Sequence, residues 1–90
     1  MSQLSDPLPR PTLPVTSAQL RQLIGGIDTR INLKQLKDNT PFRDAGADSF
    51  DLFTIILAVQ DAYAIVIPDG DIGNVNTLDN MAKYINGKLS

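Results

Sequence analysis

The 90-residue sequence predicts an all-α fold with three main helices and one short helix, following a proline-rich leader. Residues 17–30, 49–63 and 78–87 place apolar side chains at the i, i+3, i+4 spacing of amphipathic helices. A residue that can cap a helix precedes each of these stretches. No segment shows a convincing strand pattern or an internal repeat, so we expect one small helical domain.

The composition excludes several classes of function. The chain has no Cys and no His, so it lacks thiolate metal ligands, disulfides and the usual general base. Hydrophobic residues make up 42% of the chain, but no apolar run is long enough to span a bilayer and no signal-peptide pattern begins the sequence. We therefore expect a cytoplasmic, monomeric, non-catalytic protein that neither binds metal nor inserts into membranes.

The net charge of −2 is unevenly distributed along the chain. Residues 1–43 carry +3 and residues 44–90 carry −5, and all ten acidic residues are Asp. A pI of about 4.7 argues against nucleic-acid binding, which depends on basic residues. An acidic second half instead suits basic partner proteins.

Residues 1–15 form the predicted leader. Four prolines at positions 7, 9, 11 and 14 prevent a helix and favour an extended, solvated chain. The leader's leucines offer an alternative, in which it docks on another surface; we predict a disordered tail. The folded domain is then expected to span residues 16–90.

The first helix is predicted over residues 17–30. Thr16 or Ser17 can cap it, and Gln19 has the spacing of a capping box with Thr16. Gly25 and Gly26 interrupt the pattern, and each costs a helix about 1 kcal/mol relative to Ala. Either the second half of the helix frays or bends, or the small residues permit a close helix crossing, and the sequence leaves both open. The apolar positions are Leu20, Leu23, Ile24, Ile27 and Ile31.

A long connection over residues 32–44 then leads to the second helix, predicted over residues 49–63. Connections of this length in a compact domain are uncommon and often functional. The second helix is apolar nearly all round, so its second face is either core or an exposed patch for partners. The first face consists of Leu52, Ile55, Ile56, Val59 and Tyr63, and the second of Phe50, Phe53 and Leu57.

The last third of the chain begins with an extended segment over residues 64–68 and a turn. A short helix is predicted over residues 72–75. Thr77 is expected to cap the last helix and Gly87 to end it.

Residues 69–80 have a superficial likeness to a calcium-binding loop. An EF-hand needs an oxygen ligand, a glycine and a bidentate glutamate at its fifth, sixth and twelfth positions. Gly73, Asn74 and Asn80 occupy those positions, so the pattern fails at all three.

The stretch Gly46-Ala47-Asp48-Ser49-Phe50 carries the candidate chemistry. Asp48 is a good N-cap, which places the Ser49 hydroxyl at the exposed start of the second helix. A chain without His or Cys offers no residue to activate this hydroxyl. Ser49 is therefore expected to be acted on by another enzyme.

This stretch resembles the Asp-Ser-Leu motif of acyl and peptidyl carrier proteins, with Phe50 in place of Leu. Two further blocks resemble the family: the Ile-x-Ile-Pro-Asp run at residues 65–69 and the Thr-led helix that follows Thr77. The resemblance covers about residues 20–85. It implies a four-helix carrier-protein bundle in which Ser49 carries 4′-phosphopantetheine, making the chain a phosphoprotein.

The resemblance also implies how such a protein works. A phosphopantetheinyl transferase, supplying Mg²⁺ and the base, moves the group from coenzyme A to Ser49. Acyl or aminoacyl groups are then carried as thioesters between loading and processing enzymes of fatty-acid, polyketide or related pathways. The resemblance implies partner contacts by Asp48, Phe50, Asp51, Phe53, Thr54, Leu57 and Val75, and an acyl pocket lined by Ile55, Ile56, Val59, Ile67, Met81 and Ile85, with Val75 belonging to both sets.

Some positions depart from the family pattern. Thr54 and Gln60 stand where recognition acids are expected, and only Asp51 and Asp61 remain acidic along the second helix. This predicts docking through apolar contact and a specialised cargo, such as a secondary metabolite, an unusual lipid or an aminoacyl group. The alternatives are an unmodified helical module that binds partners through its apolar patch, and a calcium-responsive module.

Overall fold

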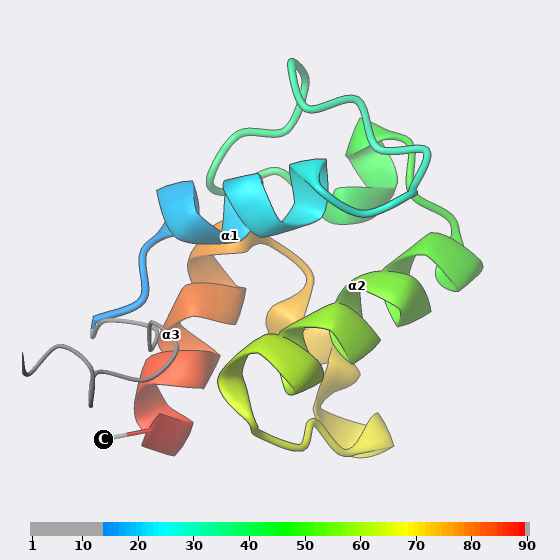
Figure 1. Cartoon of the computed structure of the whole chain (residues 1–90). Helices are drawn as coiled ribbons and strands as arrows, with labels where there is room; N and C mark the ends of the chain where they lie inside the picture. The colour runs from blue at the N-terminus through cyan, green and yellow to red at the C-terminus, as the bar shows by residue number, and fades with distance from the viewer. Residues whose placement is uncertain (1–13, 90) are drawn as a thin grey trace, which may run out of the picture.

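The computed structural model describes residues 14–89, and its elements are all helical. They are α1 (Ser17–Gly25), the 3₁₀ turn η2 (Phe42–Ala45), α2 (Ser49–Tyr63), the 3₁₀ helix η3 (Asp69–Val75) and α3 (Leu78–Leu89) (Figure 1). The all-α prediction is confirmed, with η2 as an element that the sequence did not indicate. The predicted disorder of the leader falls mainly on residues 1–13, which lie outside the described part of the chain.

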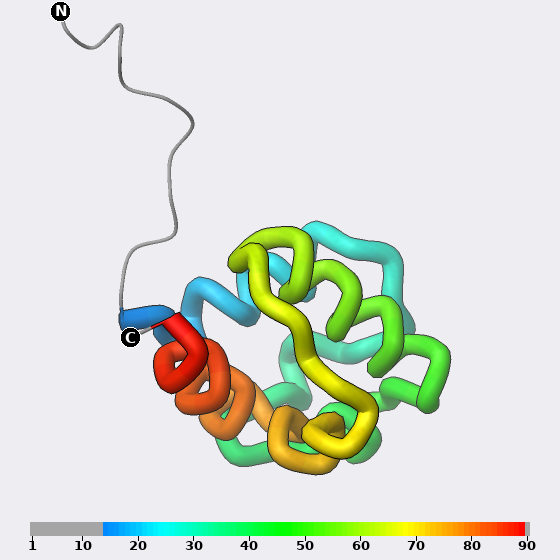
Figure 2. The backbone as a smooth tube through the Cα atoms, turned by 90° about the horizontal axis from the view of Figure 1, so that it is seen from below, coloured from blue at the N-terminus to red at the C-terminus, as the bar shows by residue number. Residues whose placement is uncertain are grey.

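The helices surround one apolar core. α1 contacts both α2 and α3, and η3 packs against α3 (Figure 1). Seen from below, the segment from α2 to η3 runs between α2 and α3 (Figure 2). Among the described residues, no helix is both long and apolar enough to cross a membrane.

Helix α1 is shorter than predicted. Thr16 and Gln19 form the expected capping box, but the helix ends at Gly25 rather than Arg30. A Cβ on Gly25 would lie 3.1 Å from Leu33 Cδ1. The glycine therefore allows the loop that contains Leu33 to pack close to α1, and no second helix crosses there. Ile27 and Ile31 still pack against the core from the loop, which explains why their helical spacing was misleading.

The long connection between α1 and α2 is held by specific contacts. The Arg21 guanidinium donates to the carbonyls of Leu33 and Leu36, and Leu36 is fully buried. The Phe42 N–H donates to the Asn76 carbonyl at 2.9 Å, which ties η2 to the junction of η3 and α3. This connection is therefore a fixed part of the fold that delivers the chain to α2.

Helix α2 has the predicted bounds, and its last turn is joined by a side-chain hydrogen bond to the segment that follows. Ala64, with φ 55°, ends the helix in the left-handed conformation. The Gln60 Oε1 accepts the N–H of Ile67 at 2.8 Å, which fastens the extended segment back onto the helix. Gln60 thus has a structural role that its place in the sequence did not reveal.

Helix η3 begins at Asp69, three residues before the predicted start, and is anchored to α3 by one side-chain contact. The Tyr84 hydroxyl donates to the Asp71 carboxylate at 2.7 Å. Burial, together with this hydrogen bond and the charge of Asp71, raises the pKa of Tyr84 to about 12. Asp71 is thus accounted for by packing, and the described residues contain no cluster of acidic side chains that could hold a metal.

Helix α3 begins after Thr77, as predicted, and the Thr77 hydroxyl accepts the Asn80 N–H at 3.0 Å. The prediction that Gly87 ends the helix was wrong, because the helix continues to Leu89. A glycine is tolerated inside a helix at a cost of about 1 kcal/mol, and a Cβ at Gly87 would meet open space.

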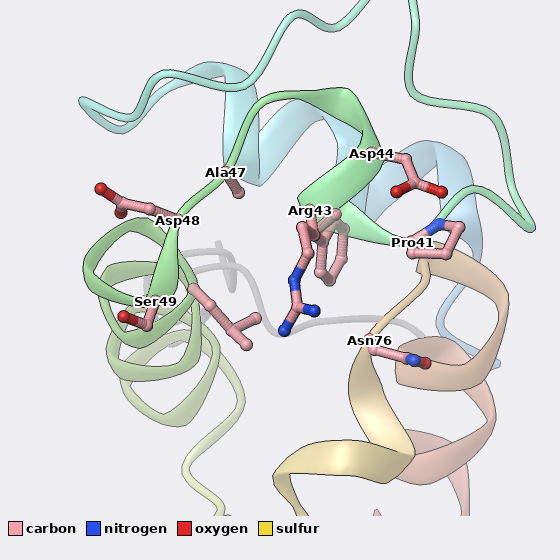
Figure 3. Close-up of a pocket in the computed structure, with 9 residues that line it drawn as sticks. Pro41, Arg43, Asp44, Ala47, Asp48, Ser49 and Asn76 are labelled. Atoms are coloured by element: carbon pink, nitrogen blue, oxygen red, sulfur yellow. The ribbon is translucent and has the colours of Figure 1, made fainter.

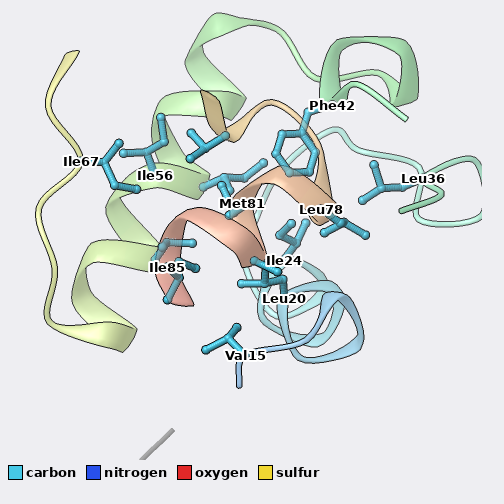
Figure 4. Packing of buried hydrophobic residues seen from close by; sticks show 14 of the residues in the cluster. Val15, Leu20, Ile24, Leu36, Phe42, Ile56, Ile67, Leu78, Met81 and Ile85 are labelled. Atoms are coloured by element: carbon cyan, nitrogen blue, oxygen red, sulfur yellow. The ribbon is translucent and has the colours of Figure 1, made fainter. Parts of the chain in front are cut away.

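The folded domain begins one residue earlier than predicted. Asn86 accepts the Val15 N–H at 2.7 Å and donates to the Val15 carbonyl at 3.0 Å. Val15 is itself buried in the core (Figure 4). This pair joins the segment before α1 to α3, so Val15 belongs to the domain and not to the leader.

The core is built from every element. Phe42 reaches it from η2, next to Met81 and Leu78 of α3, while Leu20 and Ile24 enter from α1 (Figure 4). Because side chains from the loop and from all helices share one cluster, the position of α2 depends on the packing of the loop.

Replacing Phe42 tests this dependence. Because Phe42 is 2% exposed, we expect Phe42→Ala to lower the free energy of unfolding by about 3–5 kcal/mol, measured by urea denaturation. Phe53→Ala is the matched control, since Phe53 is 53% exposed and should cost clearly less. Equal losses for the two variants would contradict the described core.

The Tyr84–Asp71 contact predicts a loss of stability in alkali. Because the folded-state pKa of about 12 exceeds the ordinary value of about 10, neutral Tyr84 stabilises the fold below about pH 10 and this contribution disappears as the pH approaches 12. We expect Tyr84→Phe to lose less stability over this window than the wild type. Asp71→Asn should lower the Tyr84 pKa, measured by tyrosinate absorbance, and an unchanged titration would show that the contact does not form.

Candidate functional site

A left-handed glycine leads the chain into α2. Gly46 has φ 106°, and a Cβ there would lie 3.1 Å from the Arg30 carbonyl oxygen. The N–H groups of Gly46 and Ala47 donate to the carbonyls of Arg43 and Phe42, which closes η2. The turn therefore needs glycine, both for its backbone angles and for the close approach of the loop.

Asp48 and Asp51 start α2 by capping each other. The Asp51 N–H donates to the Asp48 carboxylate at 2.9 Å, and the Asp48 N–H donates to the Asp51 carboxylate at 3.2 Å. The sequence predicted Asp48 as the cap but did not reveal the reciprocal role of Asp51. The usual capping-box pattern has Glu or Gln at the third residue of the helix, and here that residue is Asp51.

The Asp48 carboxylate is held in its charged form. The hydrogen bond from the Asp51 N–H lowers the pKa of Asp48, and the charge of Arg30, 3.4 Å away, acts in the same direction. Partial loss of hydration opposes both effects without reversing them. Asp48 is therefore committed to the helix start and is not free to act as a base.

Ser49 is the first residue of α2 and is exposed. Figure 3 shows its hydroxyl on the outer side of the helix, pointing to solvent. Within residues 14–89 the hydroxyl has no hydrogen-bond partner that could draw away its proton. The geometry offers a reachable hydroxyl with no internal activation.

The second apolar face of α2 is exposed. Phe50, Phe53 and Leu57, which we call the apolar patch, are 75%, 53% and 48% exposed. The sequence left open whether this face of the helix is part of the core or exposed, and the structure shows that it is exposed. Thr54 lies half-buried beside it and donates to the Phe50 carbonyl at 3.1 Å.

Two residues predicted to contact partners are not on the surface. Asp51 is 5% exposed because its carboxylate caps the helix, and Val75 is fully buried at the end of η3. Neither side chain can reach a partner in this structure.

The residues predicted to line an acyl pocket all belong to the core. They come from α2, α3 and the extended segment, and they pack in one cluster (Figure 4). These side chains are Ile55, Ile56, Val59, Ile67, Met81 and Ile85.

A hollow of about 330 Å³ opens beside Ser49, on the side facing η2. Its walls come from η2, the start of α2 and the residue before Thr77 (Figure 3). The sequence does not reveal this hollow, because Asn76 is brought to η2 only by the fold, through the hydrogen bond from the Phe42 N–H. The lining residues are Pro41, Phe42, Arg43, Asp44, Ala47, Asp48, Ser49, Leu52 and Asn76.

The cap at Asp48 predicts a stability loss in acid. Because the pKa of Asp48 is lowered in the folded protein, the charged carboxylate stabilises the fold at any pH above its ordinary pKa of about 3.9. This contribution is lost as the pH falls through the pKa of Asp48 in the folded protein. We expect Asp48→Asn, which keeps the oxygen acceptor, to show a weaker acid dependence in urea unfolding than the wild type. Asp48→Ala should be destabilised already at neutral pH, and wild-type stability in Asp48→Ala would contradict the role of the cap.

Comparison with known proteins is consistent with this site. Residues 18–85 match the family model described as phosphopantetheine attachment site. A mitochondrial acyl carrier protein of Neurospora crassa is 28% identical over 69 residues, which cover 76% of this chain and 52% of that protein. An acyl carrier protein of Wolinella succinogenes is 30% identical over 56 residues, or 61% of this chain and 74% of that protein.

The chain thus spans about half the length of the Neurospora relative. The matched region contains α1, the long connection, α2, η3 and most of α3, so it includes the whole described site. 4′-Phosphopantetheine is the group that becomes attached to members of this family. The chain belongs to the acyl carrier protein family of phosphopantetheine attachment domains.

Proposed function

We propose that this protein carries acyl or aminoacyl groups as thioesters on 4′-phosphopantetheine attached to Ser49. The observation that supports the proposal best is the position of Ser49, exposed at the start of α2 behind the Asp48 cap, within the region that matches the family. The arm's terminal thiol supplies the thioester chemistry that a chain without cysteine lacks. The protein is then a carrier, and catalysis belongs to its partners.

Attachment needs an external enzyme. The Ser49 oxygen forms a bond to the phosphorus next to the pantetheine, the diphosphate link of coenzyme A breaks, and adenosine bisphosphate leaves. The Ser49 proton passes to a base on the phosphopantetheinyl transferase, which also supplies Mg²⁺. Ser49 contributes an accessible oxygen, and the cap keeps that oxygen at the helix end.

Partner enzymes are proposed to dock on the apolar patch. Its three side chains lie on the helix that begins with Ser49, and Asp48 adds a partly exposed charge. Along α2 only Asp61 is an exposed acid, because Asp51 is buried. Docking should therefore depend on apolar contact more than on charge, which favours a specialised pathway over a housekeeping one.

The cargo and the compartment are further parts of the proposal. An acyl chain would enter the core by separating the side chains of α2 and α3, among them Ile56 and Met81. The protein is proposed to act as a cytoplasmic monomer. The Neurospora relative is named as a mitochondrial protein.

An unmodified interaction module is the second candidate, and the exposure of the apolar patch favours it. A module of this kind would bind partners through Phe50, Phe53 and Leu57 without needing the Ser49 hydroxyl. The two candidates differ in whether a covalent arm forms.

Modification of Ser49 distinguishes a carrier protein from an unmodified interaction module. We expect intact-mass measurement, after incubation with a promiscuous transferase and coenzyme A, to show one added phosphopantetheine on the wild type and none on Ser49→Ala. Ser17→Ala is the matched control, because Ser17 is likewise the first residue of a capped helix. It should be modified as fully as the wild type.

Two results would sink the carrier proposal. One is a wild type that gains no mass, and the other is a Ser49→Ala variant that still gains the arm. Circular dichroism of each variant shows whether the fold is kept.

A further inference from the structure

Arg43 presents a charge to the hollow beside Ser49. Its guanidinium extends into the space between the start of α2 and Asn76 (Figure 3). Within residues 14–89 the ion pairs are made by Arg30 and Lys83, and the Arg43 side chain has no hydrogen-bond or ion-pair partner. A guanidinium offers five N–H donors in a planar fork that matches the oxygens of a phosphate or carboxylate.

The neighbouring acids do not neutralise this charge. Asp48 accepts the Asp51 N–H and pairs with Arg30 on the other side of the helix start. The Asp44 carboxylate, on the rim, points away from the guanidinium (Figure 3). The hollow therefore keeps one unpaired positive group.

The hollow also has apolar walls. Pro41, Phe42 and Leu52 contribute apolar side chains to its lining. Asn76 lines it as well, but its side chain extends away from Arg43 (Figure 3), and its Oδ1 accepts the Asn80 amide at 3.3 Å. Such a lining suits an elongated ligand with an anion at one end.

The structure assigns this hollow to the arm itself, an inference that rests on the proposed function. The Ser49 hydroxyl points outward before modification (Figure 3). We propose that the Ser49 side chain rotates when it carries the arm, so that its phosphodiester pairs with Arg43 and this contact turns the arm into the hollow. The volume of about 330 Å³ lies at the lower end of small-molecule sites, about 300–1,000 Å³. Arg43 is thus a positioning residue that sets the direction in which the arm leaves α2.

The test compares the arm in holo proteins by NMR. Wild type, Arg43→Gln and the matched control Lys37→Gln are each loaded by a transferase and checked by intact mass. Lys37 is an exposed cation of the same connection that does not line the hollow. We expect nuclear Overhauser effects from the pantetheine protons to Leu52 and to the Asn76 side-chain amide in the wild type and in Lys37→Gln.

Arg43→Gln should weaken these effects about twofold to fivefold, because an exposed ion pair biases a geometry only modestly. Added salt should weaken them in the wild type as well. Equal effects in all three proteins, or effects to Phe53 and Leu57 instead, would overturn the inference while leaving the carrier function intact. Failure of the wild type to gain the arm would instead count against the proposed function.

Discussion

Two hydrogen bonds between Asp48 and Asp51 set the start of α2, and the placement of the functional side chains depends on that start. A helix repeats every 3.6 residues, so the spacing of the apolar residues along α2 decides which side chains share its buried face. Ile55 and Val59 turn inward while Phe50 and Phe53 stay outside. The cap fixes where this helix begins, so that the accessible Ser49 hydroxyl stands at its end, with an apolar surface beside it and the core beneath.

The cap alone does not hold the site, because the segments around it come from distant parts of the chain. Arg21 fastens the long connection from the side of α1, and the Phe42–Asn76 hydrogen bond fastens it to the start of α3. These contacts bring Arg43 and Asn76 together in the lining of the hollow beside Ser49. The long connection, whose length suggested a functional role, thus shapes the surroundings of the attachment point.

Local signals in the sequence predicted the features that depend on local physics. The Asp48 cap and the apolar spacing were enough to predict both ends of α2. The family motif was enough to identify Ser49 as the candidate attachment site. Contacts between elements explain most of the misses, because Gln60 of α2 accepts a hydrogen bond from Ile67 in the extended segment and Val75 is buried by tertiary packing. The end of α1 was missed because Ile27 and Ile31 keep helical spacing while packing from a loop.

The central claim is that Ser49 exists to carry an arm and its cargo, and the protein from its native host tests this most directly. The measurement is the intact mass of the chain purified without reducing or nucleophilic reagents, before and after hydroxylamine treatment. The account predicts a mass above that of the bare chain, a decrease when hydroxylamine releases the thioester cargo, and a remaining phosphopantetheine located on the peptide that contains Ser49. A native protein with the mass of the bare chain, or an arm on another residue, would contradict it.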